Sequence, residues 1–152
     1  DALDEAMENA NESQDREFTT IMFDIDFFKQ VNDTYGHAGG DAVLISFAKL
    51  LESEITSPNI VGRIGGEEFL AILYLNQDQA AEFCKKLIIK INDNTVNFDG
   101  IDIKISSSGG VAFSSETNTS ADLTNKADER LYEAKKSGRN RFKLIDSELV
   151  GD

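Results

Sequence analysis

The sequence predicts an α+β fold in which a central mixed, mainly antiparallel sheet is flanked by helices. Two hairpin signals support this prediction: Gly65-Gly66 joins two short apolar runs, and Asp99-Gly100 joins two more. A two-residue Gly65-Gly66 loop would supply the positive φ angles that primed hairpin turns require. Before and after these hairpins, apolar residues recur at helical spacing. Hairpins mixed with crossover helices imply helices packed on a mixed sheet.

The first elements are predicted to be a helix, a strand and two further helices. Residues 1–11 place apolar side chains at helical spacing, which indicates an amphipathic helix. Residues 19–23 are β-branched or apolar and indicate a buried strand. A short helix over 27–35 is expected to end at Gly36, because glycine suits the position just after a helix. A longer helix over 37–55 carries the next apolar stripe.

The remaining elements follow the two hairpin signals. The segment between the hairpins indicates a helix that faces the core, and the last helix is expected to close at Gly138. In chain order we predict a helix over 77–92, a hairpin of 95–98 with 101–105 whose second arm continues to 113, a helix over 121–136 and an edge strand over 141–145.

Composition predicts one acidic globular domain. The chain has 152 residues, which is enough to bury a core without disulfides or metals. We expect a domain over 1–145 and an acidic C-terminal tail over 146–152. With 28 acidic against 15 basic residues, the net charge of -13 disfavours nucleic-acid binding, which needs clustered basic side chains. It does not disfavour a nucleotide enzyme, since bound cations set the local field there.

The cysteine count and the hydropathy pattern exclude several other classes. Cys84 is the only cysteine, so the chain has no internal disulfide and no cysteine metal site. We expect Cys84 to be a buried core thiol. No apolar run approaches the length of a membrane span, and no signal peptide is visible.

Two acidic turns are the candidate functional features. Asp24 directly follows the first predicted strand. In open α/β sheets, ligands bind at the carboxyl ends of strands, which is where Asp24 would lie. Glu67 and Glu68 follow the Gly65-Gly66 pair. Carboxylate oxygens at both turns suit magnesium, which takes one or two carboxylates plus substrate phosphates. Each turn also has a structural interpretation, with Asp26 as a helix cap and the glutamates as surface acids of a solvated turn.

Three motifs stand in order along the chain: Phe23-Asp24-Ile25-Asp26-Phe27-Phe28-Lys29-x-x-Asn32-Asp33-x-x-Gly36-His37-x-x-Gly40-Asp41, Arg63-x-Gly65-Gly66-Glu67-Glu68-Phe69, and Ala127-Asp128-x-x-Leu131-Tyr132-x-Ala134-Lys135-x-x-Gly138-Arg139-Asn140. Together they resemble the GGDEF domain of bacterial diguanylate cyclases, in its GGEEF variant. Three motifs in order are far more specific than one short pattern. The resemblance extends to Phe142 and implies a palm-like nucleotidyl cyclase fold.

The resemblance implies an enzyme, a nucleotidyltransferase that condenses two GTP into cyclic di-GMP and two pyrophosphates. Asp24 and Glu67 would bind two Mg²⁺ ions, or Mn²⁺ in their place, and the carbonyl of Ile25 would add an oxygen ligand. Two metals can clamp the attacking and leaving oxygens of an in-line displacement. We expect the metal on Glu67 first, while either Glu67 or Glu68 can serve as general base.

The resemblance also implies which residues hold the triphosphate. Lys29 is expected to meet phosphate oxygens, and the backbone amides of Phe27 and Phe28, at a helix start, could hold the phosphates. Lys135 and Arg139 would reach the terminal phosphates. Cations also suit the C-terminal end of a helix for purely structural reasons.

Guanine recognition is expected from the second half of the first motif. In the family, the residues at the positions of Asn32 and Asp41 bind the base, and a carboxylate accepts the paired N1 and N2 donors that adenine lacks. Such a site favours GTP over ATP because adenine would leave its polar groups unpaired. The alternative for Asp41 is helix capping near Gly39-Gly40. His37 is expected to be a turn residue or a contact at the substrate edge.

The sequence departs from the family in two places. Many members carry Arg-x-x-Asp before the Gly-Gly turn, where the product binds and inhibits, and the corresponding residues here are Thr56 and Asn59. We therefore predict no product inhibition at this site. The family's Asp-x-Leu-Thr-Gly-x-x-Asn-Arg stretch is also absent from the start, so we expect a trimmed fragment of a longer protein.

The resemblance carries expectations about partners and location. Catalysis needs a homodimer, because each domain holds one GTP, and an upstream sensor or dimerising domain would set that dimer. We expect no nucleic-acid partner and no direct membrane contact from this fragment. The location is expected to be cytoplasmic, including as the cytoplasmic part of a membrane-anchored protein.

Two other functions remain open. A catalytically silent GGDEF module would bind GTP and signal through a protein partner, although it would not need to keep all of Asp24, Lys29, Asp41, Glu67 and Glu68. A phosphatase or receiver-type domain would use Asp24 as phospho-acceptor. That function requires alternating parallel strands and helices, which the pattern does not show, and it leaves the second acidic turn unexplained.

Overall fold

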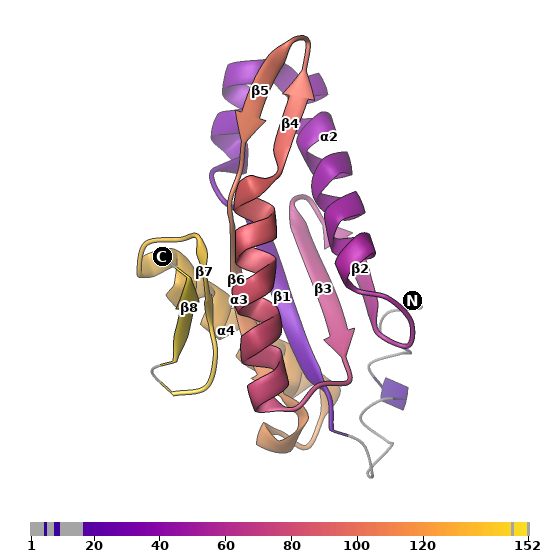
Figure 1. Cartoon of the computed structure of the whole chain (residues 1–152). Helices are drawn as coiled ribbons and strands as arrows, with labels where there is room; N and C mark the ends of the chain where they lie inside the picture. The colour runs from indigo at the N-terminus through magenta and orange to yellow at the C-terminus, as the bar shows by residue number, and fades with distance from the viewer. Residues whose placement is uncertain (1–4, 6–7, 10–16, 147, 152) are drawn as a thin grey trace.

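A computed structural model describes residues 5, 8–9, 17–146 and 148–151 and confirms the α+β fold (Figure 1). The helix predicted over 1–11 lies largely outside the described residues. In chain order the elements are β1 (Thr19–Ile25), α2 (Phe28–Glu54), β2 (Ile60–Gly65), β3 (Glu68–Leu73), α3 (Gln77–Asp93), β4 (Thr95–Phe98), β5 (Ile101–Lys104), β6 (Ser107–Phe113), the 3-10 helix η1 (Ser114–Glu116), α4 (Ser120–Lys136), β7 (Arg141–Lys143) and β8 (Leu149–Gly151).

The central sheet is mixed and mainly antiparallel, as predicted. Its six strands run in the order β2-β3-β1-β6-β7-β8, and β6 and β7 are the parallel pair in it. Strands β4 and β5 form a separate two-stranded sheet. The two strands that carry the acidic turns, β1 and β3, are neighbours in the middle of the main sheet.

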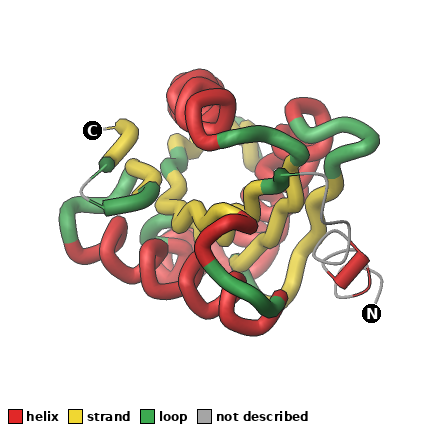
Figure 2. The backbone as a smooth tube through the Cα atoms, turned by 90° about the horizontal axis from the view of Figure 1, so that it is seen from below, coloured by secondary structure: helices red, strands yellow, loops and turns green. Residues whose placement is uncertain are grey.

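Helices cover both faces of the sheet (Figures 1 and 2). Phe23 packs with Phe47 of α2 in the larger core, and the rings lie edge-on at 6.4 Å between centroids. Met22 packs with Leu131 of α4 in a second core on the other face. Because side chains alternate along a strand, Asp24 lies on the same face as Met22, beside α4.

The predicted break in the long helical region is confirmed at Gly36. Helix α2 contains one residue with non-helical dihedrals, Gly36, at φ 77° and ψ 173°. A positive φ costs glycine little because it has no Cβ. The region is therefore two helical pieces, 28–35 and 37–54, that meet at a kink.

The hairpin between β2 and β3 forms, but its loop differs from the prediction by one residue. Gly65 pairs with Glu68, so the loop residues are Gly66 and Glu67 and not Gly65-Gly66. The register shifts between Arg63 and Gly65, which is the mark of a bulge. Gly66 alone of the two glycines has a positive φ, +49°. The bulge moves Glu67 from the strand into the turn.

The C-terminal strands also differ from the prediction. Strand β7 is not an edge strand, since it lies between β6 and β8. Strand β8 falls within the segment predicted as an acidic tail, and its Val150 is buried. A three-residue strand is too short to show alternation in sequence, and only its pairing with β7 defines it.

The second arm of the second hairpin is interrupted. The arm predicted to continue to residue 113 consists of β5 and β6, which belong to different sheets. At the step between them, the amide of Asp26 donates to the carbonyl of Ser106 at 2.9 Å. The end of β1 therefore replaces β4 as the partner of this arm from here on.

The remaining sequence expectations concern the core and the membrane. Cys84 is fully buried, as predicted, and burial raises the pKa of its thiol. Among the described residues, no helix combines the length and the hydropathy needed to cross a bilayer.

Candidate active site

Three carboxylates from the two acidic turns gather at one end of the sheet. Asp24 and Glu68 are register partners on antiparallel strands β1 and β3, so their side chains share a face. Glu67 lies in the adjoining loop, where its carbonyl accepts from the amide of Ile25 at 3.4 Å. The pairing of β1 with β3 thus brings together residues that are more than forty positions apart.

A lysine from helix α4 lies beside these carboxylates. Lys135, in the last turn of α4, forms an ion pair with the Asp24 carboxylate. The side chain of Asp24 is 7% exposed and that of Lys135 is 31% exposed. Lys135 therefore lies over the carboxylates with one side open to solvent.

The carboxylates carry more negative charge than Lys135 offsets. Burial raises the pKa of Asp24 against the opposing hydrogen bond and charge of Lys135, and the charges of Glu67 and Asp26 raise it further. Burial also raises the pKa of Glu68, with added effect from Asp24. Such a site favours a bound cation, because a cation would relieve the repulsion between the acids.

The donor set fits magnesium shared with a substrate. Among the described residues, no group of three or more acids, histidines and cysteines is close enough to hold a metal ion by itself. Magnesium commonly takes only one or two protein carboxylates and completes its shell with substrate phosphates and water. Asp24, Glu67 and the carbonyl of Ile25 would supply the protein oxygens for such an ion.

Asp26 does not cap the following helix, so that interpretation is wrong. The residue before α2 is Phe27, and the helix has no side-chain cap. The buried carboxylate of Asp26 instead accepts from the hydroxyls of Ser106 and Ser108, both at 2.6 Å, and from the amide of Asn140 at 2.9 Å. It ties the end of β1 to β6 and to the turn after α4, a role that the sequence did not indicate.

That turn places Arg139 over an exposed aromatic ring. Gly138, Arg139 and Asn140 all have positive φ angles, and the bond from the Asn140 amide to Asp26 holds the turn in place. The Arg139 guanidinium lies 4.7 Å from the centre of the Phe27 ring, a cation–π distance. Phe27 itself is in the left-handed region, with φ 56°. Arg139 is thus held at the start of α2.

The residues predicted to bind guanine lie on the two pieces of α2. Asn32 is half-buried on the first piece, and Asp41 is exposed on the second. Asp41 lies inside the helix, so it is not a cap. His37 is exposed next to the kink. Among the described residues, neither His37 nor Lys29 is joined to the carboxylates by a hydrogen bond or an ion pair.

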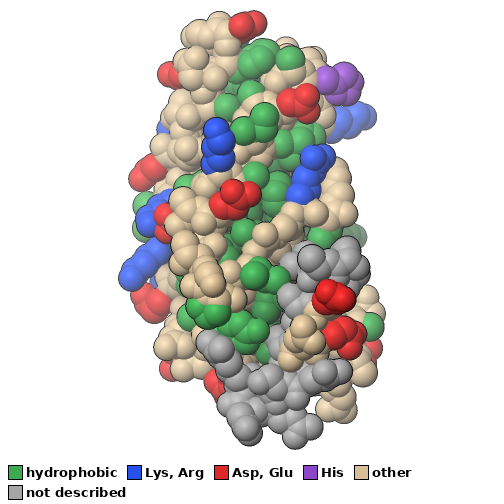
Figure 3. Space-filling view, turned by 90° about the vertical axis from the view of Figure 1, so that its right-hand side faces the viewer, with side chains coloured by type: hydrophobic (Ala, Val, Ile, Leu, Met, Phe, Trp, Pro, Cys, Tyr) green, Lys and Arg blue, Asp and Glu red, His purple; other side chains and the backbone are tan. Residues whose placement is uncertain are grey.

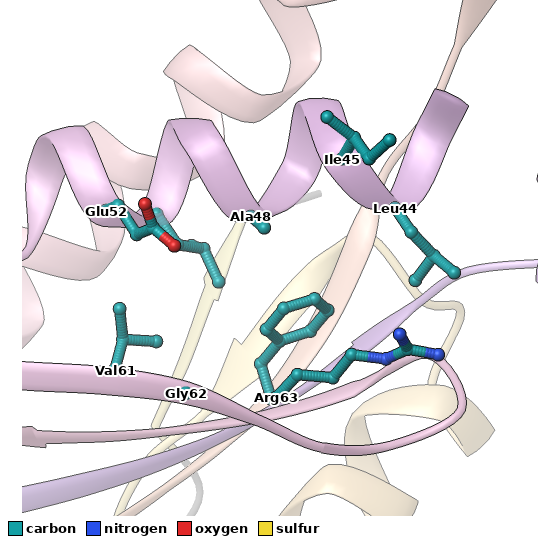
Figure 4. Close-up of a pocket in the computed structure, with 9 residues that line it drawn as sticks. Leu44, Ile45, Ala48, Glu52, Val61, Gly62 and Arg63 are labelled. Carbon is teal, nitrogen blue, oxygen red and sulfur yellow. The ribbon is translucent and has the colours of Figure 1, made fainter. Parts of the chain in front are cut away.

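An apolar cavity of about 180 Å³ lies beside the second piece of α2, and sequence reasoning missed it. Figure 4 shows Leu44 and Ala48 of α2 across from Val61 and Arg63 of β2. Figure 3, seen from this side, shows hydrophobic side chains in a band down the middle of this face. Leu44 is one helical turn after Asp41, so the cavity adjoins the turn that carries Asp41.

Known proteins resemble this chain in sequence and in fold. The family model described as "Diguanylate cyclase, GGDEF domain" matches residues 1–141. Diguanylate cyclase A of Treponema denticola is 36% identical over 143 residues, which are 93% of this chain and 38% of that protein. The chain therefore spans well under half of that relative.

Solved structures also resemble this chain in fold. The diguanylate cyclase SiaD of Pseudomonas aeruginosa, solved with its activator SiaC, has a TM-score of 0.89 and 33% identity, covering 95% of this chain and 57% of that one. The active GGEEF domain of a diguanylate cyclase from Vibrio cholerae has a TM-score of 0.83 and 29% identity, covering 97% and 96%. This chain belongs to the diguanylate cyclase GGDEF domain family.

Proposed function

We propose that this domain condenses two GTP into cyclic di-GMP and two pyrophosphates. The observation that carries the proposal is the register pair of Asp24 and Glu68 at the sheet end, with Glu67 in the next loop and Lys135 across from Asp24. Family membership and relatives named as diguanylate cyclases support it.

Asp24, Glu67 and the Ile25 carbonyl would hold two Mg²⁺ ions, with Mn²⁺ as a substitute. When bound, the ions would lower the pKa of the attacking hydroxyl and neutralise charge on the phosphates. Glu68 is then the better candidate for general base, because its raised pKa improves proton acceptance near neutral pH.

The cations around the carboxylates would hold the triphosphate. Lys135 already lies at Asp24, and the cation–π contact with Phe27 holds Arg139 at the start of α2. Lys29 and the first amides of α2, at Phe27 and Phe28, would add donors to phosphate oxygens. These groups stabilise the negative charge that builds on the departing pyrophosphate.

Asn32 and Asp41 would recognise guanine, with His37 at the substrate edge. The Asp41 carboxylate would accept from the N1 and N2 donors of guanine, which adenine does not offer.

One domain binds one GTP in this proposal, so the reaction needs two domains. The 3′-hydroxyl of one GTP attacks the α-phosphorus of the other, its proton passes to the general base, and the bond to pyrophosphate breaks. Repeating the step in the other direction closes the ring. A dimerising segment or sensor elsewhere in the full protein would bring the domains together.

The product is proposed not to inhibit through the site that Thr56 and Asn59 occupy. The side chain of Asn59 accepts from the amide of Tyr74 at 2.8 Å and so fastens the start of β2 to the end of β3. Thr56 is exposed and carries no charge.

The direct test is to incubate the domain, with and without a fused dimerising coiled coil, with GTP and Mg²⁺ and to separate the nucleotides by chromatography. We expect cyclic di-GMP, at least about a hundredfold less of it with Glu67→Gln, and no change with the exposed control Glu82→Gln. Tight GTP binding without product, even from the fused dimer, would contradict the proposal and favour the silent module.

A further inference from the structure

In helix α2, the side chain of Asn32 packs against the backbone of Gly40. A Cβ built on Gly40 would lie 1.8 Å from Oδ1 of Asn32 and 2.9 Å from its Cγ. Both distances are shorter than real Cβ contacts allow. The side-chain amide of Asn32 therefore rests in the space that any other residue at position 40 would fill.

Gly40 is not required by the backbone conformation. It lies within the helix and is not among the glycines with positive φ. Glycine inside a helix lowers stability relative to alanine. The neighbouring Gly39 gives the same kind of space, since a Cβ there would lie 2.4 Å from the Cβ of Tyr35. The glycine pair lets the two pieces of α2 pack closely across the kink.

Packing is what holds Asn32. In the part of the chain that the structure describes, no hydrogen bond engages its side-chain amide, so the N–H donors of that amide have no protein partner there and can bind a ligand. Gly40, against which the amide packs, directly precedes Asp41 in the sequence.

We propose that Gly40 is a positioning residue for base recognition: the bare backbone at position 40 sets the Asn32 amide beside Asp41, so that both meet one guanine. The inference rests on the proposed function, in which these two residues bind the base. Gly40 does not itself contact substrate. It acts through Asn32.

The steric part of the proposal is tested without nucleotide, by thermal unfolding of four proteins. Because the Asn32 amide must move to admit a Cβ, Gly40→Ala is expected to change Tm less favourably in the wild-type background than in an Asn32→Ala background. In an Asn32→Ala background the two clashing atoms are gone, and the next nearest atom is in the Phe28 ring, at 3.3 Å. There Gly40→Ala is expected to leave Tm unchanged or raise it, as alanine does within helices. An equal change in Tm in both backgrounds, whether a loss or a gain, would overturn the proposal.

The recognition part is tested by calorimetry with Mg²⁺ and a guanosine triphosphate whose α,β-bridging oxygen is replaced by methylene, which prevents turnover. Gly40→Ala is expected to weaken binding about tenfold, as Asn32→Ala does, with no further loss in the double variant. Binding of the adenosine counterpart should not change. Gly100→Ala is strained at φ +76° in the turn between β4 and β5, where its Cβ would meet no atom within 4 Å, so it should lower Tm and keep the preference for guanine.

The outcomes separate the two proposals. If the wild-type domain does not bind the guanosine analogue, the proposed function fails. If it binds and Asn32→Ala weakens binding while Gly40→Ala does not, the function stands and the role of Gly40 is overturned.

Discussion

At the scale of single residues, the sheet end keeps acids together against their mutual repulsion. Asp24 and Glu68 are partners on the neighbouring strands β1 and β3, and Lys135 is the cation paired with Asp24. Burial and neighbouring charges raise the pKa of both acids. Binding sites often store this kind of electrostatic strain, because the ligand relieves it.

Glu68→Gln is predicted to stabilise the domain slightly in EDTA at pH 7. Because the folded-state pKa of Glu68 is raised, the folded protein binds more protons than the unfolded chain, and stability falls as pH rises through that pKa. Removing the charge removes this loss at neutral pH. Below the usual carboxyl pKa of 4.5 the advantage should vanish, since wild-type Glu68 is then protonated.

Thermal unfolding at pH 7 and pH 4 checks this prediction. Glu82→Gln, on the exposed face of α3, controls for the general effect of removing an acid. A Tm for Glu68→Gln below that of wild type at pH 7 would show that Glu68 stabilises the metal-free fold.

Product inhibition is a second prediction for single residues. Because Asn59 has a backbone partner and Thr56 has no charge, added cyclic di-GMP is expected to leave the initial rate unchanged, apart from competition with GTP. Initial rates at several GTP and product concentrations test this. Potent non-competitive inhibition would count against it.

At the scale of elements, α4 is fastened to the sheet by a buried ion pair. Arg130 of α4 binds both carboxylate oxygens of Glu116 at 2.6 and 2.7 Å and the carbonyl of Val111 at 2.8 Å. Burial alone would raise the pKa of Glu116, but the bonds from Arg130 and the Phe113 amide outweigh it, and the pKa is lowered. Since α4 also carries Lys135, this pair fixes one side of the site.

Arg130→Met is predicted to lower the free energy of unfolding by about 3–5 kcal/mol, because it leaves the largely buried Glu116 carboxylate with the Phe113 amide but without a cation. Urea denaturation measures the loss. The matched control is Lys85→Met, which breaks the exposed pair with Glu82 and should cost little. Equal effects of the two variants would contradict the role given to Arg130.

At the scale of the whole molecule, the site is open at one end of the sheet. Its residues come from β1, the start of β3 and the loop before it, the start of α2, the end of α4 and the turn after α4. In the proposed function this end holds one nucleotide, and the second must come from another domain.

Specific activity is therefore predicted to fall on dilution of the isolated domain and to become independent of concentration when a coiled coil is fused to it. Initial rates over a hundredfold range of enzyme concentration measure this. Rates strictly proportional to the concentration of the unfused domain would show that one domain suffices.

Much of this molecule could be predicted from local sequence. Apolar periodicity indicated α3 and α4, and Gly36 marked the kink in α2 because positive φ is a local property of the chain. The loop between β2 and β3 was misplaced by one residue. Its position depends on a bulge, and a bulge is set by the register with the neighbouring strand.

Local signals in the sequence were enough to predict the elements from β1 to β4, the helix α4, the two acidic turns and the family resemblance, because periodicity, turn residues and motif spacing are all local. Other contacts could be seen only in the folded molecule: Asp24 faces Glu68, Asp26 binds Ser106, Ser108 and Asn140, and Asn32 rests on Gly40. These contacts depend on how strands pair and helices pack. Such long-range geometry comes from the burial of the whole core, which no short stretch of sequence encodes.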